Sequence, residues 1–291
     1  MPDRITLRTI RQIVRRGEKF ACLTCYDATT ARILQKAGVH LLLVGDTAAE
    51  VILGLPCTMH MPMDIAVSLT AAVKRGAPET MVMADMPFMS YQADDAEGIR
   101  NAGRFMTEGM ADLVKLEADS TFAPLVSRMT RAGIPVCAHV GSRPQRAGLT
   151  GGYSSQGRTA RQAGEVLHDA KMLEEAGAVM LLVEAVPPEV AERLVQQSNV
   201  PVIGIGAGTA PHGQILVVQD LLGMTEWQPT FAPALVNLGQ QIEEAAREWV
   251  KRVADRKVTD HRYNMLPGER DKLPGSESGS EFGDHKKILS R

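Results

Sequence analysis

Short apolar runs alternate with longer amphipathic segments along most of the chain. Eight runs rich in branched aliphatic residues can be distinguished, each ending in or near a polar residue: FACLTCYD (20–27), LLLVGD (41–46), TMVMADMPF (80–88), ADLVKLE (111–117), PVCAHVG (135–141), VMLLVEAVP (179–187), PVIGIGAG (201–208) and ILVVQD (215–220). Such runs are typical of strands buried on both faces. The segments between them, such as 28–38, 97–109 and 161–177, have the apolar spacing of helices.

This alternation predicts parallel strands joined by crossover helices. Glycine, the residue that commonly follows the last turn of a helix, stands just before the next run at Gly38, Gly109, Gly133 and Gly177. Eight strand–helix units favour a closed (β/α)8 TIM barrel over a doubly wound sheet, and such a barrel takes about 250 residues. We therefore expect one α/β domain over residues 1–258, with an N-terminal helix before the first strand.

The last residues, 259–291, have a different composition. They are polar, contain several Gly, Ser and Pro residues and have few aliphatic ones. A segment of this kind buries too little apolar surface to offset the entropy lost on ordering. We expect residues 259–291 to be a largely disordered tail without a catalytic role.

Composition excludes several kinds of partner. The formal net charge is −2, which does not favour binding to nucleic acid or to an anionic membrane. The charged N-terminus lacks the apolar core of a signal peptide, and no apolar run approaches the roughly 18 residues that span a bilayer. Cys22 and Cys25 form a CxxC pair, but on a strand they point to opposite faces. We expect a cytoplasmic protein with reduced thiols.

Candidate chemistry gathers where the predicted strands end. In a closed barrel the active site forms at the carboxyl ends of the strands. The residues found there are Asp27, Asp46, Asp85, Glu117, His139, Glu184 and Asp220. Any one carboxylate could simply cap the following helix. Closure of the barrel would bring them together at one mouth, however, where they would repel each other unless a cation lay between them.

Asp46, Asp85 and Glu117, from three successive strands, are the best candidates for metal ligands. All three offer oxygen, so the expected ion is Mg²⁺ or a similar hard cation. Lys115 lies two residues before Glu117, so both side chains can point into the barrel. Lys115 is then either an anion-binding group or one half of an ion pair.

His139 and Glu184 complete the set of candidates. His139 is either a substrate contact or a buried, hydrogen-bonded histidine. Glu184 follows apolar residues and precedes Pro187 and Pro188, and apolar surroundings raise the pKa of a carboxylic acid toward values that suit proton transfer. The GIGAG stretch (204–208) lacks the GxGxxG spacing and the P-loop lysine, so it favours close approach to a ligand more than nucleotide binding.

At these same residues the sequence resembles the ketopantoate hydroxymethyltransferase family. The resemblance runs over roughly residues 15–225 and rests on several matching stretches: TCYDATTARIL (24–34), LLVGDT (42–47), TAAVKRGAP (70–78), ADMPFMSY (84–91), ADLVKLE (111–117), IPVCAHVG (134–141), GGYSSQGR (151–158), LLVEAVP (181–187) and PVIGIGAGTAPHGQILVVQDLLGM (201–224). It implies a TIM barrel, one Mg²⁺ per subunit and a folate co-substrate. The family transfers a hydroxymethyl group from 5,10-methylenetetrahydrofolate to 3-methyl-2-oxobutanoate, giving 2-dehydropantoate in pantothenate biosynthesis.

The resemblance also implies roles for individual residues. The metal positions match Asp46, Asp85 and Glu117, and the proton acceptor matches Glu184. The contacts to the 2-oxo acid match Asp46, Thr47, Asp85 and Lys115, with His139 as a further candidate. The family further implies a homo-oligomer, with a homodecamer as the expected assembly. The chain departs from the family at Thr47, where Ser is usual, at Ser68 and Leu69, where Tyr and His are usual, and at Ser154, where Lys is common.

Two other functions remain open on the sequence. One is a different metal-dependent C–C bond lyase or transferase of the phosphoenolpyruvate mutase/isocitrate lyase superfamily, acting on a 2-oxo acid without folate. The other is a catalytically inactive barrel that serves as a binding or scaffold protein. The complete set of acids argues against the second.

Overall fold

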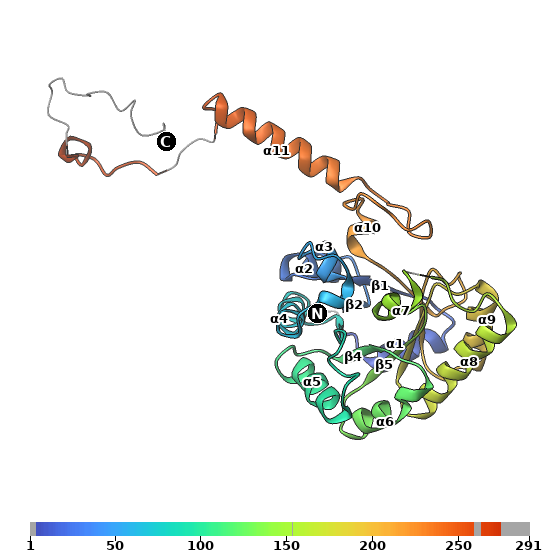
Figure 1. Ribbon diagram of the computed structural model, residues 1–291. Helices are drawn as coiled ribbons and strands as arrows, with labels where there is room; N and C mark the ends of the chain where they lie inside the picture. Colours follow the sequence, from blue (N-terminus) through green and yellow to red (C-terminus); the bar gives the residue numbers. More distant parts are fainter. Residues whose placement is uncertain (1–3, 153, 259–262, 275–291) are drawn as a thin grey trace. The chain divides into compact units, whose positions relative to one another are not determined.

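Eight parallel strands form a closed barrel in which each strand pairs with its neighbours in sequence and β8 pairs with β1 (Figure 1). The computed structural model describes residues 4–152, 154–258 and 263–274. The strands are β1 (Phe20–Thr24), β2 (Leu41–Val44), β3 (Met81–Asp85), β4 (Leu113–Glu117), β5 (Val136–Gly141), β6 (Met180–Glu184), β7 (Val202–Ile205) and β8 (Gly213–Leu216). The predicted α/β TIM barrel is confirmed.

Helices follow the strands on the outside of the barrel (Figure 1). They are α1 (Leu7–Arg15), α2 (Ala28–Lys36), α3 (Ala48–Val51), α4 (Met63–Gly76), α5 (Asp95–Thr107), α6 (Ala123–Arg131), α7 (Ala147–Thr150), α8 (Ala160–Glu175), α9 (Pro188–Gln197) and α10 (Val218–Leu221). Short 3-10 turns are η1 (Thr58–His60), η2 (Ser120–Phe122) and η3 (Pro144–Arg146). The N-terminal helix α1 buries Ile10 and Ile13 against the residues that fill the barrel.

One local prediction was wrong. The last apolar run was expected to continue as a strand to Asp220, but β8 ends at Leu216 and Asp220 lies in α10. Gly38, Gly133 and Gly177 have positive φ, as glycine after a helix commonly does, whereas after α5 it is Met110 that has positive φ (+55°). All four cysteines are free, as expected.

The structure divides into two units, residues 1–240 and 241–291. The barrel lies within the first. The second contains most of α11 (Leu238–Ala254), whose Ile242 and Trp249 are about half exposed, and the short turn η4 (Arg270–Lys272). The tail expected over residues 259–291 falls largely outside the described residues, and its disorder stays a prediction.

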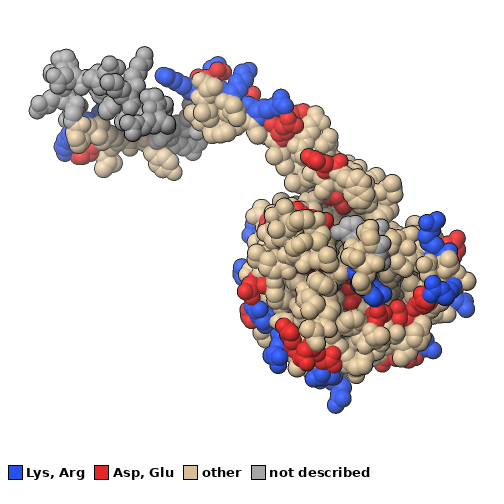
Figure 2. All heavy atoms as spheres, viewed as in Figure 1, with Lys and Arg blue, Asp and Glu red and all other residues tan. Residues whose placement is uncertain are grey.

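No helix in the described ranges is both long and apolar enough to cross a membrane. On the face of the barrel unit seen in Figure 2, acidic and basic side chains are interspersed around the rim. This mixture agrees with the small net charge of −2.

The interior of the barrel is filled by side chains from alternate strand positions. Cys22, Leu41, Met81, Leu113 and Cys137 belong to one buried cluster with Met180, Ile203 and Ile215. Since side chains alternate along a strand, this cluster fixes which residues point inward at the carboxyl ends.

Closure of the barrel between β1 and β8 depends on close packing at Gly213. Gly213 pairs with Phe20, and a Cβ at position 213 would lie 2.3 Å from the Phe20 ring. We predict that Gly213→Ala lowers the free energy of unfolding by about 1–3 kcal/mol through overpacking. Gly164→Ala is the control, because nothing lies within 4 Å of a Cβ there; in the α8 interior it should stabilise by about 0.5–1 kcal/mol. Urea unfolding measures both, and equal stability of the two variants would contradict this account.

Candidate active site

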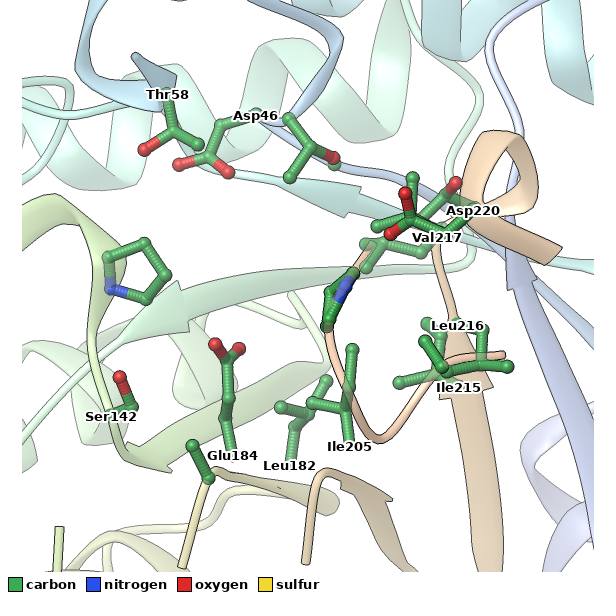
Figure 3. Close-up of a pocket in the computed structure, with 18 of the residues that line it drawn as sticks. Asp46, Thr58, Ser142, Leu182, Glu184, Ile205, Ile215, Leu216, Val217 and Asp220 are labelled. Atoms are coloured by element: carbon green, nitrogen blue, oxygen red, sulfur yellow. The ribbon is translucent and has the colours of Figure 1, made fainter. Parts of the chain in front are cut away.

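Alternate side chains of each strand point into the barrel, and this brings the predicted polar residues together at one mouth. Leu113 lies in the barrel interior, so Lys115 and Glu117 point inward above it. By the same alternation Asp85 follows Met81 and Met83, His139 follows Cys137, and Glu184 follows Met180 and Leu182. These polar side chains line one cavity of about 350 Å³ together with Asp46 and Thr47, which follow β2 (Figure 3).

A buried ion pair joins β3 and β4 at the centre of the mouth. The Nζ atom of Lys115 lies 2.9 Å from Oδ1 of Asp85, and these side chains are 5% and 2% exposed. The other carboxylate oxygen of Asp85 accepts a hydrogen bond from the backbone N–H of Asp46 at 3.2 Å. Burial alone would lower the pKa of Lys115, but Asp85, Asp46 and Glu117 raise it, so the ammonium group is charged.

Asp46 and Glu117 add two further buried carboxylates. Burial, followed by repulsion from Asp85, raises the pKa of Asp46 to about 8. Burial also raises the pKa of Glu117 well above its usual range, and Asp46 and Asp85 raise it further. Asp46, Asp85, Glu117 and Glu184 thus line the same cavity as the Lys115 ammonium group. An added cation would relieve this repulsion.

Glu184 faces the same cavity from the end of β6. Its side chain is 23% exposed, and its Oε2 atom lies 3.4 Å from Nε2 of His139. Burial raises the pKa of Glu184 to about 7, against an opposing effect of Lys115. Burial and the nearby Lys115 lower the pKa of His139 well below its usual value, so the imidazole is neutral. A carboxyl group with a pKa near neutrality is suited to accept and return a proton.

Gln145, in η3, connects the carboxylates and was not predicted. Its side-chain Nε2 donates to Oδ2 of Asp46 and to the carbonyl oxygen of Met86, both at 3.0 Å. Its backbone N–H donates to Oε2 of Glu117, also at 3.0 Å. Its Oε1 accepts from the Tyr91 hydroxyl at 3.1 Å. An amide in an irregular loop carries no sequence signal for this role.

Thr47 and Thr58 also line the cavity. Thr47 is half-buried, and its hydroxyl lies 2.6 Å from the Tyr26 hydroxyl. Thr58, which the sequence did not single out, is 2% exposed and lies near Asp46 (Figure 3). Its hydroxyl has no hydrogen-bond partner among the described residues, and such a buried group is available to a ligand.

Other expected positions lie outside the cluster of acids. Asp27 is exposed and caps α2, accepting from the backbone N–H groups of Thr29 and Thr30 at 2.8 Å. Asp220 lines the far side of the same cavity (Figure 3). The GIGAG glycines accommodate protein side chains: a Cβ at Gly206 would lie 3.1 Å from the Phe231 ring.

The donor set fits a hard divalent cation held partly by the protein. In the described part of the chain, no three His, Cys, Asp or Glu side chains are arranged to hold a metal ion between them. Mg²⁺, however, is usually bound through one or two carboxylates, with substrate oxygens and water completing its octahedron. Oδ1 of Asp85 is buried and paired with the ammonium group of Lys115 at 2.9 Å, and a carboxylate oxygen has a second lone pair that can bind a cation beside Asp46. The three-carboxylate set with Glu117 stays a prediction.

Comparison with known proteins gives a consistent family. The model of the family described as ketopantoate hydroxymethyltransferase matches residues 4–260. The chain is 42% identical to the 3-methyl-2-oxobutanoate hydroxymethyltransferase of Syntrophus aciditrophicus, over 90% of this chain and 97% of that one. It is 40% identical to the enzyme of that name from Hyperthermus butylicus, over 98% of this chain and 94% of that one.

Among solved structures, the chain is similar to a phosphonopyruvate hydrolase in complex with oxalate and Mg²⁺, with a TM-score of 0.59, 14% identity and coverage of 94% of this chain and 96% of that one. It is also similar to 2,3-dimethylmalate lyase, a member of the phosphoenolpyruvate mutase/isocitrate lyase superfamily, with a TM-score of 0.57, 16% identity and coverage of 92% and 94%. At such low identity these likenesses show a shared fold. They therefore support the alternative lyase function less well than the sequence relatives support hydroxymethyl transfer.

Gln145 gives the most direct test of how the carboxylates are held. Gln145→Ala removes the donor to Asp46, so we predict that Mg²⁺ affinity falls about 10–100-fold, the usual effect of losing a group that orients a metal ligand. Isothermal titration calorimetry measures the affinity. The control is Gln92→Ala, because Gln92 donates to Oε1 of Gln145 and is therefore one hydrogen bond further from Asp46. Equal Mg²⁺ affinity in the two variants would show that Gln145 does not position Asp46.

Proposed function

The chain belongs to the ketopantoate hydroxymethyltransferase family, and on this basis we propose that it transfers a hydroxymethyl group from 5,10-methylenetetrahydrofolate to 3-methyl-2-oxobutanoate, giving 2-dehydropantoate for pantothenate synthesis. The observation that carries the proposal is the arrangement of one cavity. Glu184, with a pKa near neutrality, faces the same space as Asp46, Asp85 and Lys115.

The acidic half of the cavity is suited to a 2-oxo acid. The buried ammonium group of Lys115 offsets the negative charge of the substrate carboxylate and of the enolate formed from it. Thr47 and Thr58 contribute hydroxyl groups near Asp46, and His139 is a further substrate contact. A divalent cation bound by Asp46 and Asp85, with Glu117 nearby, would polarise the keto and carboxylate oxygens of the substrate.

Proton removal is assigned to Glu184. In its ionised form the carboxylate accepts the C3 proton of 3-methyl-2-oxobutanoate, leaving the electron pair as an enolate. The enolate carbon forms the new C–C bond with the one-carbon unit of the folate, and water supplies the hydroxyl oxygen. Both C–N bonds from that carbon to N5 and N10 of the folate break, and the two nitrogens take up the proton removed from C3 and one proton from the water. His139 is neutral and lies beside this carboxylate, with Nε2 3.4 Å from Oε2 of Glu184. Glu184 then returns the proton when the product leaves.

The assembled acids also bear on the inactive-barrel alternative. A scaffold has no need to bury Asp46, Asp85, Lys115 and Glu117 together, since each buried charge has a desolvation cost. The homodecamer stays a prediction from the family resemblance, and the cytoplasmic location stays a prediction from the sequence.

Asp85 provides a test of the metal site. Asp85→Asn keeps the shape of the side chain but removes its charge, so Mg²⁺ binding should weaken and turnover should be largely lost. Asparagine is preferable to alanine here, because its amide oxygen can still accept a hydrogen bond from the buried ammonium group of Lys115. Both variants lose the ion pair, which can cost about 3–5 kcal/mol of stability. Asp27→Asn is the matched control, because Asp27 is also an acid that follows a strand, but it caps α2 and lies outside the cavity. Normal turnover of Asp85→Asn in metal-limited buffer would rule out this assignment.

Glu184 tests the proton step. Glu184→Gln keeps size and hydrogen bonding but cannot accept the proton. Exchange of the C3 proton with solvent deuterium should therefore slow by about 10²–10⁴-fold, the usual contribution of a positioned base, while substrate and Mg²⁺ still bind. Exchange is followed by NMR at saturating substrate, with the exposed Glu189→Gln as control. If Glu184 only pairs with a cation, substrate binding or stability suffers and exchange in the bound complex stays at the wild-type rate.

A further inference from the structure

The cavity has a second half that the 2-oxo acid does not use. Asp46 and Glu184 lie on one side of the cavity, and Ile215, Leu216 and Asp220 lie across from them (Figure 3). This far side is mainly apolar, and its walls come from the ends of β6 to β8 and from the segment after α10. It is lined by Leu182, Ile205, Ile215, Leu216, Trp227 and Phe231. A small anionic substrate leaves such a surface unfilled.

Two aromatic side chains face this apolar half. Trp227 is 74% exposed and Phe231 is 45% exposed, although both line the cavity. Aromatic residues make up only 4% of the chain, so two on one wall is a notable concentration. The Phe231 ring packs on Gly206, where a Cβ would lie 3.1 Å from it. Because Gly206 has no side chain, the Phe231 ring can pack against the backbone there while part of the ring remains exposed.

A carboxylate completes this half. Asp220 is 8% exposed, and its Oδ1 atom accepts a hydrogen bond from the Thr225 hydroxyl at 2.8 Å. A carboxylate has acceptor capacity for several donors. The proton-removal step does not use Asp220. Flat apolar walls with one acidic acceptor match a heteroaromatic ring that carries adjacent N–H donors.

We propose that this half of the cavity binds the pteridine ring of the reduced folate, with Trp227 and Phe231 against its faces and the N–H groups of its aminopyrimidinone edge donating to Asp220. The proposal rests on the proposed function and deepens it. Since both halves belong to one cavity, the one-carbon unit of a ring bound there can reach the enolate carbon beside Glu184.

A neighbouring cavity of about 500 Å³ is the main competitor for the donor. It is lined by Phe88, Phe122, Arg143 and Arg146 and reaches Glu117 and Gln145, but Glu184 is not among its lining residues. Both arginines already pair with Asp119, at 2.7 and 3.0 Å. A donor bound there would be separated from the carbon that loses its proton.

Tryptophan fluorescence tests the ring site directly, because the chain contains only two tryptophans. In Trp249→Phe the remaining reporter is Trp227, and tetrahydrofolate should quench its emission to saturation. In the matched control Trp227→Phe, the reporter is Trp249 of α11, and only the linear loss due to light absorption by the ligand should appear. A tetrahydropterin without the aminobenzoyl-glutamate should quench Trp227 as well, whereas aminobenzoyl-glutamate alone should not.

Kinetics test the functional consequence. Phe231→Ala and Asp220→Asn should each raise KM for methylenetetrahydrofolate about tenfold or more, the scale of one lost stacking or hydrogen-bonding contact to a base. Deuterium exchange at C3 of 3-methyl-2-oxobutanoate should stay near the wild-type rate in both variants, because that step needs only the acidic half. Circular dichroism and thermal unfolding verify that the variants fold.

The outcomes separate this inference from the proposed function. Normal turnover with an unchanged KM in folded Phe231→Ala and Asp220→Asn, or no saturable quenching of Trp227, overturns the ring site and leaves hydroxymethyl transfer intact. Quenching by aminobenzoyl-glutamate alone also overturns it, since the tail would then occupy the site. A third outcome is that tetrahydropterin quenches the emission saturably but the wild-type protein shows no turnover. That result supports the ring site and rejects the proposed function.

Discussion

The ion pair between Lys115 and Asp85 is the contact on which the mouth of the barrel depends. Both side chains are almost completely buried, with Nζ and Oδ1 2.9 Å apart. A buried ammonium group keeps its charge only beside an opposite charge. The pair is possible because β3 and β4 are in register at Asp85 and Lys115. A slip of one residue would turn Val114 and Leu116 inward and remove the charges from the cavity.

The surplus of negative charge around this pair gives the site its chemistry. Asp46 and Glu117 have raised pKa values because they are buried among other carboxylates. Gln145 holds both through hydrogen bonds from one short turn. The resulting arrangement is preorganised for a cation and an anionic substrate, so little rearrangement is needed when charge develops on the substrate. Burial raises the pKa of Glu184 to about 7, which allows this carboxyl group to exchange protons near neutral pH.

The sequence predicted those features that are encoded locally. Each strand shows as an apolar run, and the inward positions follow from alternation, so Asp85, Lys115, Glu117, His139 and Glu184 could be assigned to one mouth. Asp27 was also expected at a strand end, yet β1 ends at Thr24 and Asp27 caps α2. A strand end alone does not distinguish these two outcomes.

Residues from loops could not be found in this way. Gln145, Thr58 and Phe231 reach the cavity from segments whose positions depend on tertiary packing, such as that of Phe231 on Gly206. Asp220 was expected at a strand end and reaches the same cavity from a helix instead. The acidic half of the site was therefore largely predictable, whereas the apolar half emerged only with the structure.

The central claim is that this barrel joins a one-carbon unit to a 2-oxo acid with the help of a divalent cation. It is tested most directly by supplying 3-methyl-2-oxobutanoate and methylenetetrahydrofolate labelled with ¹³C in the transferred carbon, and by recording the product by NMR. With Mg²⁺ present, the account predicts a labelled hydroxymethyl signal on 2-dehydropantoate, and a chelator should abolish it. Absence of the label in the product, or undiminished product in the presence of the chelator, would contradict the account.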